Sequence, residues 1–291
     1  DGEFEDLERE LLGSIQEHIL DTDYDLDELS EISPRELAAH FSDAQLCAQL
    51  VNGMTVVSLS NGEQTKEKAD KVHAYAEALG VESHLVRDMK LLADEHLTVF
   101  RLDLMRRTDI AMLGKRFAKD KSVMELLKAA ASATGLGFDL EEARRFHVLG
   151  LLPAGSVGRT YWEFIRRNGF SFPGEPRAAP EIIMRHDLNH VLTGYSTSPS
   201  EEMKVGAFQA GIMRHDPFAM MVSILCQFHV GVRIAPVTGA QTGHFQPGPF
   251  ISAFVRGLGA KVPTFDPDWD PFSVMERPLS EVREEFGVAE A

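Results

Sequence analysis

Apolar residues recur three and four positions apart over most of residues 34–135, and this spacing constrains the fold more than any other feature. It places them on one side of a helix, and no segment of the region alternates strictly as a strand does. Ser33 followed by Pro34 is typical of a helix start, and Gly80 of a helix end. The pattern predicts helices over residues 34–56, 65–79 and 83–106. We therefore expect an all-α fold.

The acidic residues are concentrated at the start of the chain. Residues 1–36 hold 14 acidic and 2 basic residues, so they account for most of the formal net charge of −16. Such a segment repels nucleic acid, which excludes nucleic acid as a partner. We predict that residues 1–33 form an acidic arm or linker, with one amphipathic helix between Phe4 and Ile19.

Two cysteines, Cys47 and Cys226, stand far apart in apolar surroundings. Reduced, buried thiols of this kind are typical of a cytoplasmic protein. The most apolar run, residues 218–232, is interrupted by polar residues and is shorter than the roughly 20 apolar residues that span a membrane. We expect a cytoplasmic protein with no transmembrane segment, and peripheral contact with a membrane stays open.

Two imidazoles and two carboxylates lie within a short stretch: His186, Asp187, His190 and Glu202. A helix over 181–192 places the two histidines ~40° apart on one face, within reach of one ion. A turn follows, and a second helix starting at Ser200 brings Glu202 back in its first turn. Histidines with ordinary hydrogen bonds are the alternative. The four residues together predict a metal site, with His186, Asp187, His190 and Glu202 as ligands.

Two other metal-site patterns are less well matched. The spacing resembles that of His-Glu-x-x-His zinc proteases, but Asp187 replaces the catalytic Glu and its shorter side chain would misplace the base. A His-Asp phosphohydrolase needs a further His and Asp, for which His147 and Asp216 are the candidates. Four arginines are candidates to pair with a substrate carboxylate: Arg159, Arg185, Arg233 and Arg256.

Several ordered motifs resemble two known families. Residues 148–288 resemble the ubiquinone-biosynthesis family named for the fourth Coq protein, whose hallmark, His-Asp-x-x-His followed after eleven residues by Glu, is present at 186–202. Further matching segments are residues 151–161, 253–261, 268–272 and 278–287. Residues 58–63 and 76–81 resemble the tellurite-resistance B-like helical module. These likenesses predict three parts: an arm over 1–33, the helical module over 34–135, and a metal-binding helical domain over 136–291.

The ubiquinone-biosynthesis resemblance implies a divalent metal beside an apolar cavity, with zinc, iron, manganese and cobalt not distinguished. It implies oxidative decarboxylation and hydroxylation of a carboxylated, prenylated aromatic compound, with Asp187 and Glu202 as catalytic residues. The alternative is a non-catalytic organiser that binds an isoprenoid lipid and uses the metal structurally. Other biosynthetic enzymes and a second copy of the chain are candidate partners. An open coordination position would favour the enzyme, and four protein ligands would favour the organiser.

Overall fold

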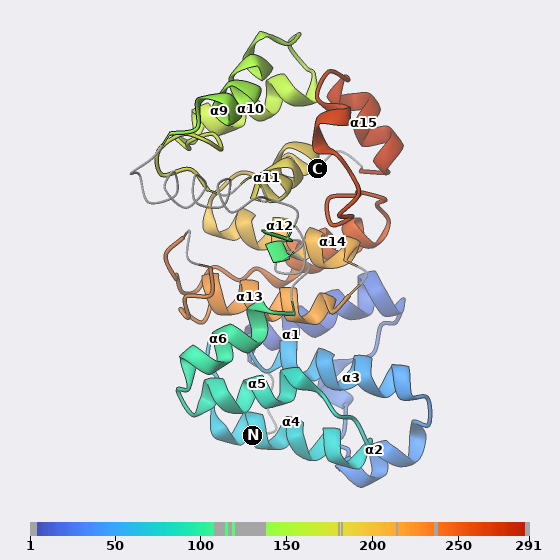
Figure 1. The fold of residues 1–291 in the computed structure, drawn as a ribbon. Coiled ribbons are helices and arrows are strands. Elements are labelled where there is room, and N and C mark those ends of the chain that lie inside the picture. Colours follow the sequence, from blue (N-terminus) through green and yellow to red (C-terminus); the bar gives the residue numbers. More distant parts are fainter. Residues whose placement is uncertain are drawn as a thin grey trace. The chain divides into compact units, whose positions relative to one another are not determined.

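The computed structural model describes residues 5–107, 114–115, 118–119, 138–179, 181, 183–213, 215–235 and 238–288. Within these residues every regular element is a helix, and the β-structure consists of isolated bridges (Figure 1). The predicted all-α fold is confirmed. No helix in the described part of the chain is long and apolar enough to cross a membrane.

The chain divides into two compact units, each made of two stretches of sequence. Unit 1 comprises residues 1–108 and 202–255, and unit 2 comprises residues 109–201 and 256–291. The helices that lie in or extend into unit 1 are α1 (Asp6–Ile15), α2 (Pro34–His40), α3 (Ala44–Val57), α4 (Lys66–Ala78), α5 (His84–Ala93), α6 (Leu97–Met105), α12 (Pro199–Ile212), α13 (Pro217–Phe228) and α14 (Pro247–Leu258). In the described part of unit 2 the α-helices are α9 (Leu140–His147), α10 (Val157–Arg167), α11 (Ile183–Thr193) and α15 (Leu279–Phe286). The predicted boundaries at 33 and 135 concern family modules and stay a prediction.

Two of the predicted helices are each broken into a pair. The helix predicted from residue 34 ends at His40, and α3 begins after Asp43, whose carboxylate accepts a hydrogen bond from the Leu46 amide at 2.8 Å. The helix predicted over 83–106 breaks where Glu95 adopts a φ of 59°. The predicted start at Ser33 is confirmed by its reciprocal hydrogen bonds with Glu36. A local cap at Asp43 and the backbone conformation of Glu95 therefore interrupt helices that the spacing of apolar residues predicts to be continuous.

The first helix of the acidic segment is packed into unit 1. Leu11 on α1 has no exposed surface, and Glu5 accepts a hydrogen bond from the Asn61 side chain at 3.2 Å. Glu10 accepts one from the backbone amide of Gly248 at 3.4 Å. Residues 6–15 thus form a helix within the predicted amphipathic segment, and this helix contributes to a core.

Residues from both stretches of sequence complete the core of unit 1. Val51, Val72 and Val86 form its centre, and α13 packs against α3 and α6 (Figure 1). His229, just after α13, is buried and donates a hydrogen bond from Nε2 to the Ser60 carbonyl at 2.7 Å. Burial lowers the pKa of His229. The two stretches of unit 1, residues 1–108 and 202–255, therefore share one core.

A buried carboxyl pair links α5 to α6. Asp88 has no exposed surface, and Arg107 donates to both Asp88 and Asp103. Burial raises the pKa of Asp88 to about 7, although the charge of Arg107 opposes the shift. Burial also acts to raise the pKa of Asp103, but hydrogen bonds from Arg87 and Asp88 and the arginine charges hold it well below its usual range. The pair therefore keeps a proton on Asp88 up to neutral pH.

Asp88→Asn is expected to remove a pH-dependent part of the stability of unit 1. The pKa of Asp88 is higher in the folded state than its ordinary 3.8, so its proton-linked contribution is complete below pH 3.8 and is lost as the pH rises through 7. The wild-type free energy of unfolding should fall relative to that of the variant by about 2 kcal/mol between pH 5.5 and 7. Urea unfolding across this range measures the difference.

The exposed Asp70→Asn on α4 is the matched control, because it removes the same charge from a solvated position. Its free energy of unfolding should run parallel to that of the wild type across this pH range. If the free energy of unfolding of Asp88→Asn also runs parallel to that of the wild type, the pKa of Asp88 is not raised in the folded protein.

Unit 2 has an aromatic core that positions α11. Phe146 on α9, Tyr161 on α10 and Phe172 after α10 are all buried, with ring centroids 6.3 to 6.4 Å apart. Helix α10 packs against both α11 and α15. This arrangement places one face of α11 against α10 and leads the chain on to α12.

Candidate metal centre

Three of the four predicted ligands converge in the structure. His186 and His190 come from α11, and Glu202 comes from the first turn of α12. One ligand atom from each residue lies within 4.8 Å of the others, so the group has the donors and the spacing to hold a metal ion. The boundary between the units falls inside α12, and Glu202 directly follows the last residue of unit 2 in that helix. The site is therefore local to a helix, a loop and the next helix.

The local sequence explains why these elements meet. Gly194 adopts a φ of 84°, which a glycine reaches without strain, and its amide donates to the His190 carbonyl at 2.8 Å. The helix therefore ends one turn after His190. Pro199 then starts α12 close by in sequence, which returns Glu202 to the two histidines.

The orientation of His190 suits a metal ligand. Its Nδ1 donates to the backbone carbonyl of Tyr195 at 3.2 Å, so in the neutral ring the lone pair is on Nε2. That Nε2 lies 3.2 Å from Nε2 of His186. Two imidazoles bound to one tetrahedral ion at 2.0–2.1 Å would place their nitrogens about 3.3 Å apart. The observed spacing fits two imidazoles that share one ion. In the absence of an ion, the Nε2–H group of His186 donates a hydrogen bond to Nε2 of His190.

The buried His190 ring is also packed in place. Phe164 of α10 stacks on it with ring centroids 5.2 Å apart. Asn168, also contributed by the α10 end, accepts a hydrogen bond from Thr197 at 2.9 Å and so holds the loop that carries the Tyr195 carbonyl. Neither contact has a signal in the sequence, because each depends on how α10 lies against α11.

Asp187 is not a member of the three-residue group found among the described residues. Burial raises the pKa of the Tyr161 hydroxyl, and the negative charge of Asp187 acts in the same direction. The roles of Asp187 as a ligand and as a proton-transfer residue stay predictions.

Three of the arginines considered as substrate partners have structural contacts instead. Buried Arg185 donates to the carbonyls of Thr264, Asp266 and Trp269 at 2.6 to 3.0 Å. Arg256 donates to the Thr193 carbonyl, at the end of α11. The third, Arg159, donates to Glu163 and to the Gly150 carbonyl. These contacts stabilise the frame around the site.

Arg283 of α15 has the same role as Arg256. It donates to the carbonyls of Leu192 at 2.8 Å and Val191 at 3.2 Å, which are left without helix partners at the end of α11. Sequence reasoning did not single out Arg283, and its place in the segment 278–287 was the one signal for it. The two arginines together hold the carboxyl end of α11.

The residues of a His-Asp phosphohydrolase do not join this group. His147 contacts Glu175 at 2.8 Å, and Asp216 caps α13 by accepting from the Ala219 amide at 3.1 Å. Neither belongs to the metal-ligating group that the described residues form. That alternative therefore has no support from the geometry.

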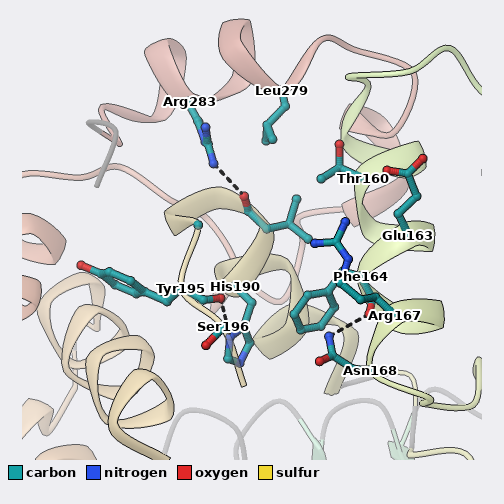
Figure 2. Close-up of a pocket in the computed structure, with 12 residues that line it drawn as sticks. Thr160, Glu163, Phe164, Arg167, Asn168, His190, Tyr195, Ser196, Leu279 and Arg283 are labelled. Carbon is teal, nitrogen blue, oxygen red and sulfur yellow. Dashed lines mark hydrogen bonds between the residues drawn. The ribbon is translucent and has the colours of Figure 1, made fainter. Parts of the chain in front are cut away.

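A pocket of about 230 Å³ adjoins the site within unit 2. His190 forms part of its wall, beside Tyr195 and Ser196, as Figure 2 shows. The other lining residues are Thr160, Glu163, Phe164, Arg167, Asn168, Val191, Gly194, Leu279 and Arg283. The pocket combines apolar side chains with two arginines and one glutamate, so its charged groups give a positive balance.

Comparison with known proteins gives one distant structural likeness. No family model matches this chain, and no curated protein sequence matches it. It is similar to a crystal structure from Nostoc punctiforme that is provisionally named a ubiquinone biosynthesis protein, with 17% sequence identity over 86% of this chain and 100% of the other. The TM-score is 0.34. This TM-score is lower than the scores of proteins that share a fold. We therefore draw no conclusion about the present chain from this similarity.

Proposed function

We propose that this protein is a metal-dependent enzyme of quinone or specialised aromatic metabolism. The observation that supports catalysis best is the convergence of two imidazoles and one carboxylate, His186, His190 and Glu202, on one point. A site made of the three ligands that converge among the described residues leaves coordination positions for substrate or water, as in zinc hydrolases and non-haem iron oxygenases. A purely structural site has four protein ligands as a rule.

The reaction class follows from the resemblance of residues 148–288 to the ubiquinone-biosynthesis family. The proposed substrate is a carboxylated aromatic compound with a prenyl chain. The bond between the ring carbon and the carboxyl group breaks to release CO₂, and the same ring carbon gains a hydroxyl group. Dioxygen supplies that oxygen atom, and its second atom leaves as water with two protons and two electrons from an external reductant.

The residues of the chain have distinct parts in this proposal. His186, His190 and Glu202 would hold the ion, which when bound supplies a Lewis acid for the substrate oxygens and, if redox-active, an electron-transfer centre. The Tyr195 carbonyl keeps His190 in the tautomer that binds. Asp187, near Tyr161, is the proposed proton-transfer group. Iron, manganese and cobalt suit this chemistry, whereas zinc binds but cannot change its oxidation state.

Reconstitution of the metal-free protein tests the proposal. The protein is loaded separately with Fe²⁺, Mn²⁺, Co²⁺ or Zn²⁺ and given prenylated 4-hydroxybenzoate with a ¹³C-labelled carboxyl group, ¹⁸O₂ and a reductant. We expect one ¹⁸O in the ring hydroxyl and equimolar ¹³CO₂ with a redox-active metal, and no turnover with zinc. Full metal occupancy with no product from any metal would contradict the enzyme and favour the lipid-binding organiser.

A further inference from the structure

We propose that the pocket in unit 2 binds the carboxylate of a small acid through Arg167, and that this binding is coupled to the metal group through His190. The coupling rests on the proposed function, because it requires that His190 binds a metal. The carboxylate site does not depend on the proposed function. Arg167 is not a member of the metal-ligating group, and of that group only His190 lines the pocket.

The walls of the pocket suit a compact acid with an apolar body. Phe164, Val191 and Leu279 supply apolar surface, whereas Thr160 and Arg167 supply polar groups. In Figure 2 the Arg167 guanidinium extends from α10 into the space enclosed by the lining residues. A ligand in this space would place its apolar part on the aliphatic and aromatic walls and its anion at the guanidinium.

Arg167 differs from the arginines around it in its contacts. Arg166 lies over the rings of Trp162 and Phe172, at 5.6 and 5.8 Å. Arg159 pairs with Glu163, and Arg283 donates to two carbonyls of α11. Within the described residues, no hydrogen bond, ion pair or ring contact of the Arg167 side chain is found. A guanidinium in this position presents the planar set of donors that a carboxylate accepts in a bidentate pair.

The same pocket touches the residues that orient His190. His190 lines the pocket, its Nδ1 donates to the Tyr195 carbonyl, and both Tyr195 and Ser196 are pocket residues. Phe164 forms another wall and stacks on the His190 ring. A bound acid therefore restricts the ring and the loop that a metal ion also requires in one position. Such coupling is reciprocal, so the metal should also tighten binding of the acid.

Calorimetric titration of the full chain with benzoate, in metal-free and Zn²⁺-loaded forms, tests both parts. Benzoate should bind the metal-free wild type, and Arg167→Gln should weaken that binding by about 10- to 100-fold, since it removes a charge-assisted pair. Arg166→Gln is the matched control, because it removes the same charge from the adjacent residue, and it should change the affinity less than twofold. Benzamide, which is neutral, should bind as weakly to the wild type as benzoate binds to Arg167→Gln.

Coupling is measured as the Zn²⁺ affinity with and without saturating benzoate. We expect an increase of about fivefold or more in the wild type and none in Arg167→Gln. Benzoate that binds only with zinc, and equally well to Arg167→Gln, would overturn the proposal, because it would be ligating the metal. Equal losses in the two arginine variants would also overturn it. Arg167-dependent binding in a protein that binds no zinc would contradict the proposed function but support the carboxylate site.

Discussion

Replacing His190 by alanine is expected to weaken metal binding by about 100-fold or more and to abolish metal-dependent turnover. His190 is the ligand with the most complete support, because the Tyr195 carbonyl fixes its tautomer and Phe164 packs against its ring. Alanine leaves only His186 and Glu202 in the group, and two ligands do not hold a divalent ion at ordinary concentrations. Metal content after dialysis and competition with a chromogenic chelator measure the loss.

His215→Ala is the matched control, since His215 is exposed and lies outside the group. It should keep the wild-type metal content. Circular dichroism of His190→Ala distinguishes a lost ligand from a lost fold, and Glu202→Gln gives a second test that keeps the side-chain volume. Wild-type affinity in both His190→Ala and Glu202→Gln would place any bound metal elsewhere in the protein.

Replacing Arg185 by methionine is expected to destabilise unit 2 by about 3–5 kcal/mol. The Arg185 side chain is buried, with 4% of its surface exposed, and donates to three backbone carbonyls between residues 264 and 269. Methionine fills similar space but has no donor, so the buried Thr264 carbonyl and the partly buried hydrogen bonds to Asp266 and Trp269 lose their partner. The loss should lower the urea midpoint, and metal binding should weaken because His186 is the next residue of α11.

Arg144→Met on α9 provides the comparison, because Arg144 is exposed. Its free energy of unfolding should stay within about 0.5 kcal/mol of the wild-type value. Arg185→Lys should recover only part of the loss, because one ammonium group cannot reach three carbonyls as the planar guanidinium does. An Arg185→Met protein as stable as Arg144→Met would show that the three hydrogen bonds do not support the site.

The sequence predicted the existence of helices better than their ends. Ser33 and Gly80 mark a start and an end because each acts within its own turn. The breaks after His40 and at Glu95 were missed, because the apolar spacing continues on both sides when two successive helices face one core. Helical periodicity indicates which residues face the core. It does not indicate where the chain turns between two helices that face the same core.

The spacing of the candidate ligands was similarly informative within one helix. His190 follows His186 by four positions, and in any α-helix residues four positions apart lie on one face. Asp187 is rotated by ~100° from His186 on the same helix, and it is not a member of the three-residue group found among the described residues. Glu202 needed a further condition, a short loop, which Gly194 and Pro199 indicate.

The sequence by itself determined the helical class, the shared face of His186 and His190, and the return of Glu202 after a short turn. Only the tertiary structure decided that Arg185 and Arg283 support the backbone, that Phe164 packs on His190, and that α1 is packed into unit 1. The reason is the range of each interaction. Helix periodicity and caps act over about four residues, whereas Arg185 reaches carbonyls 79 to 84 residues away, and such pairings exist only once the helices have packed.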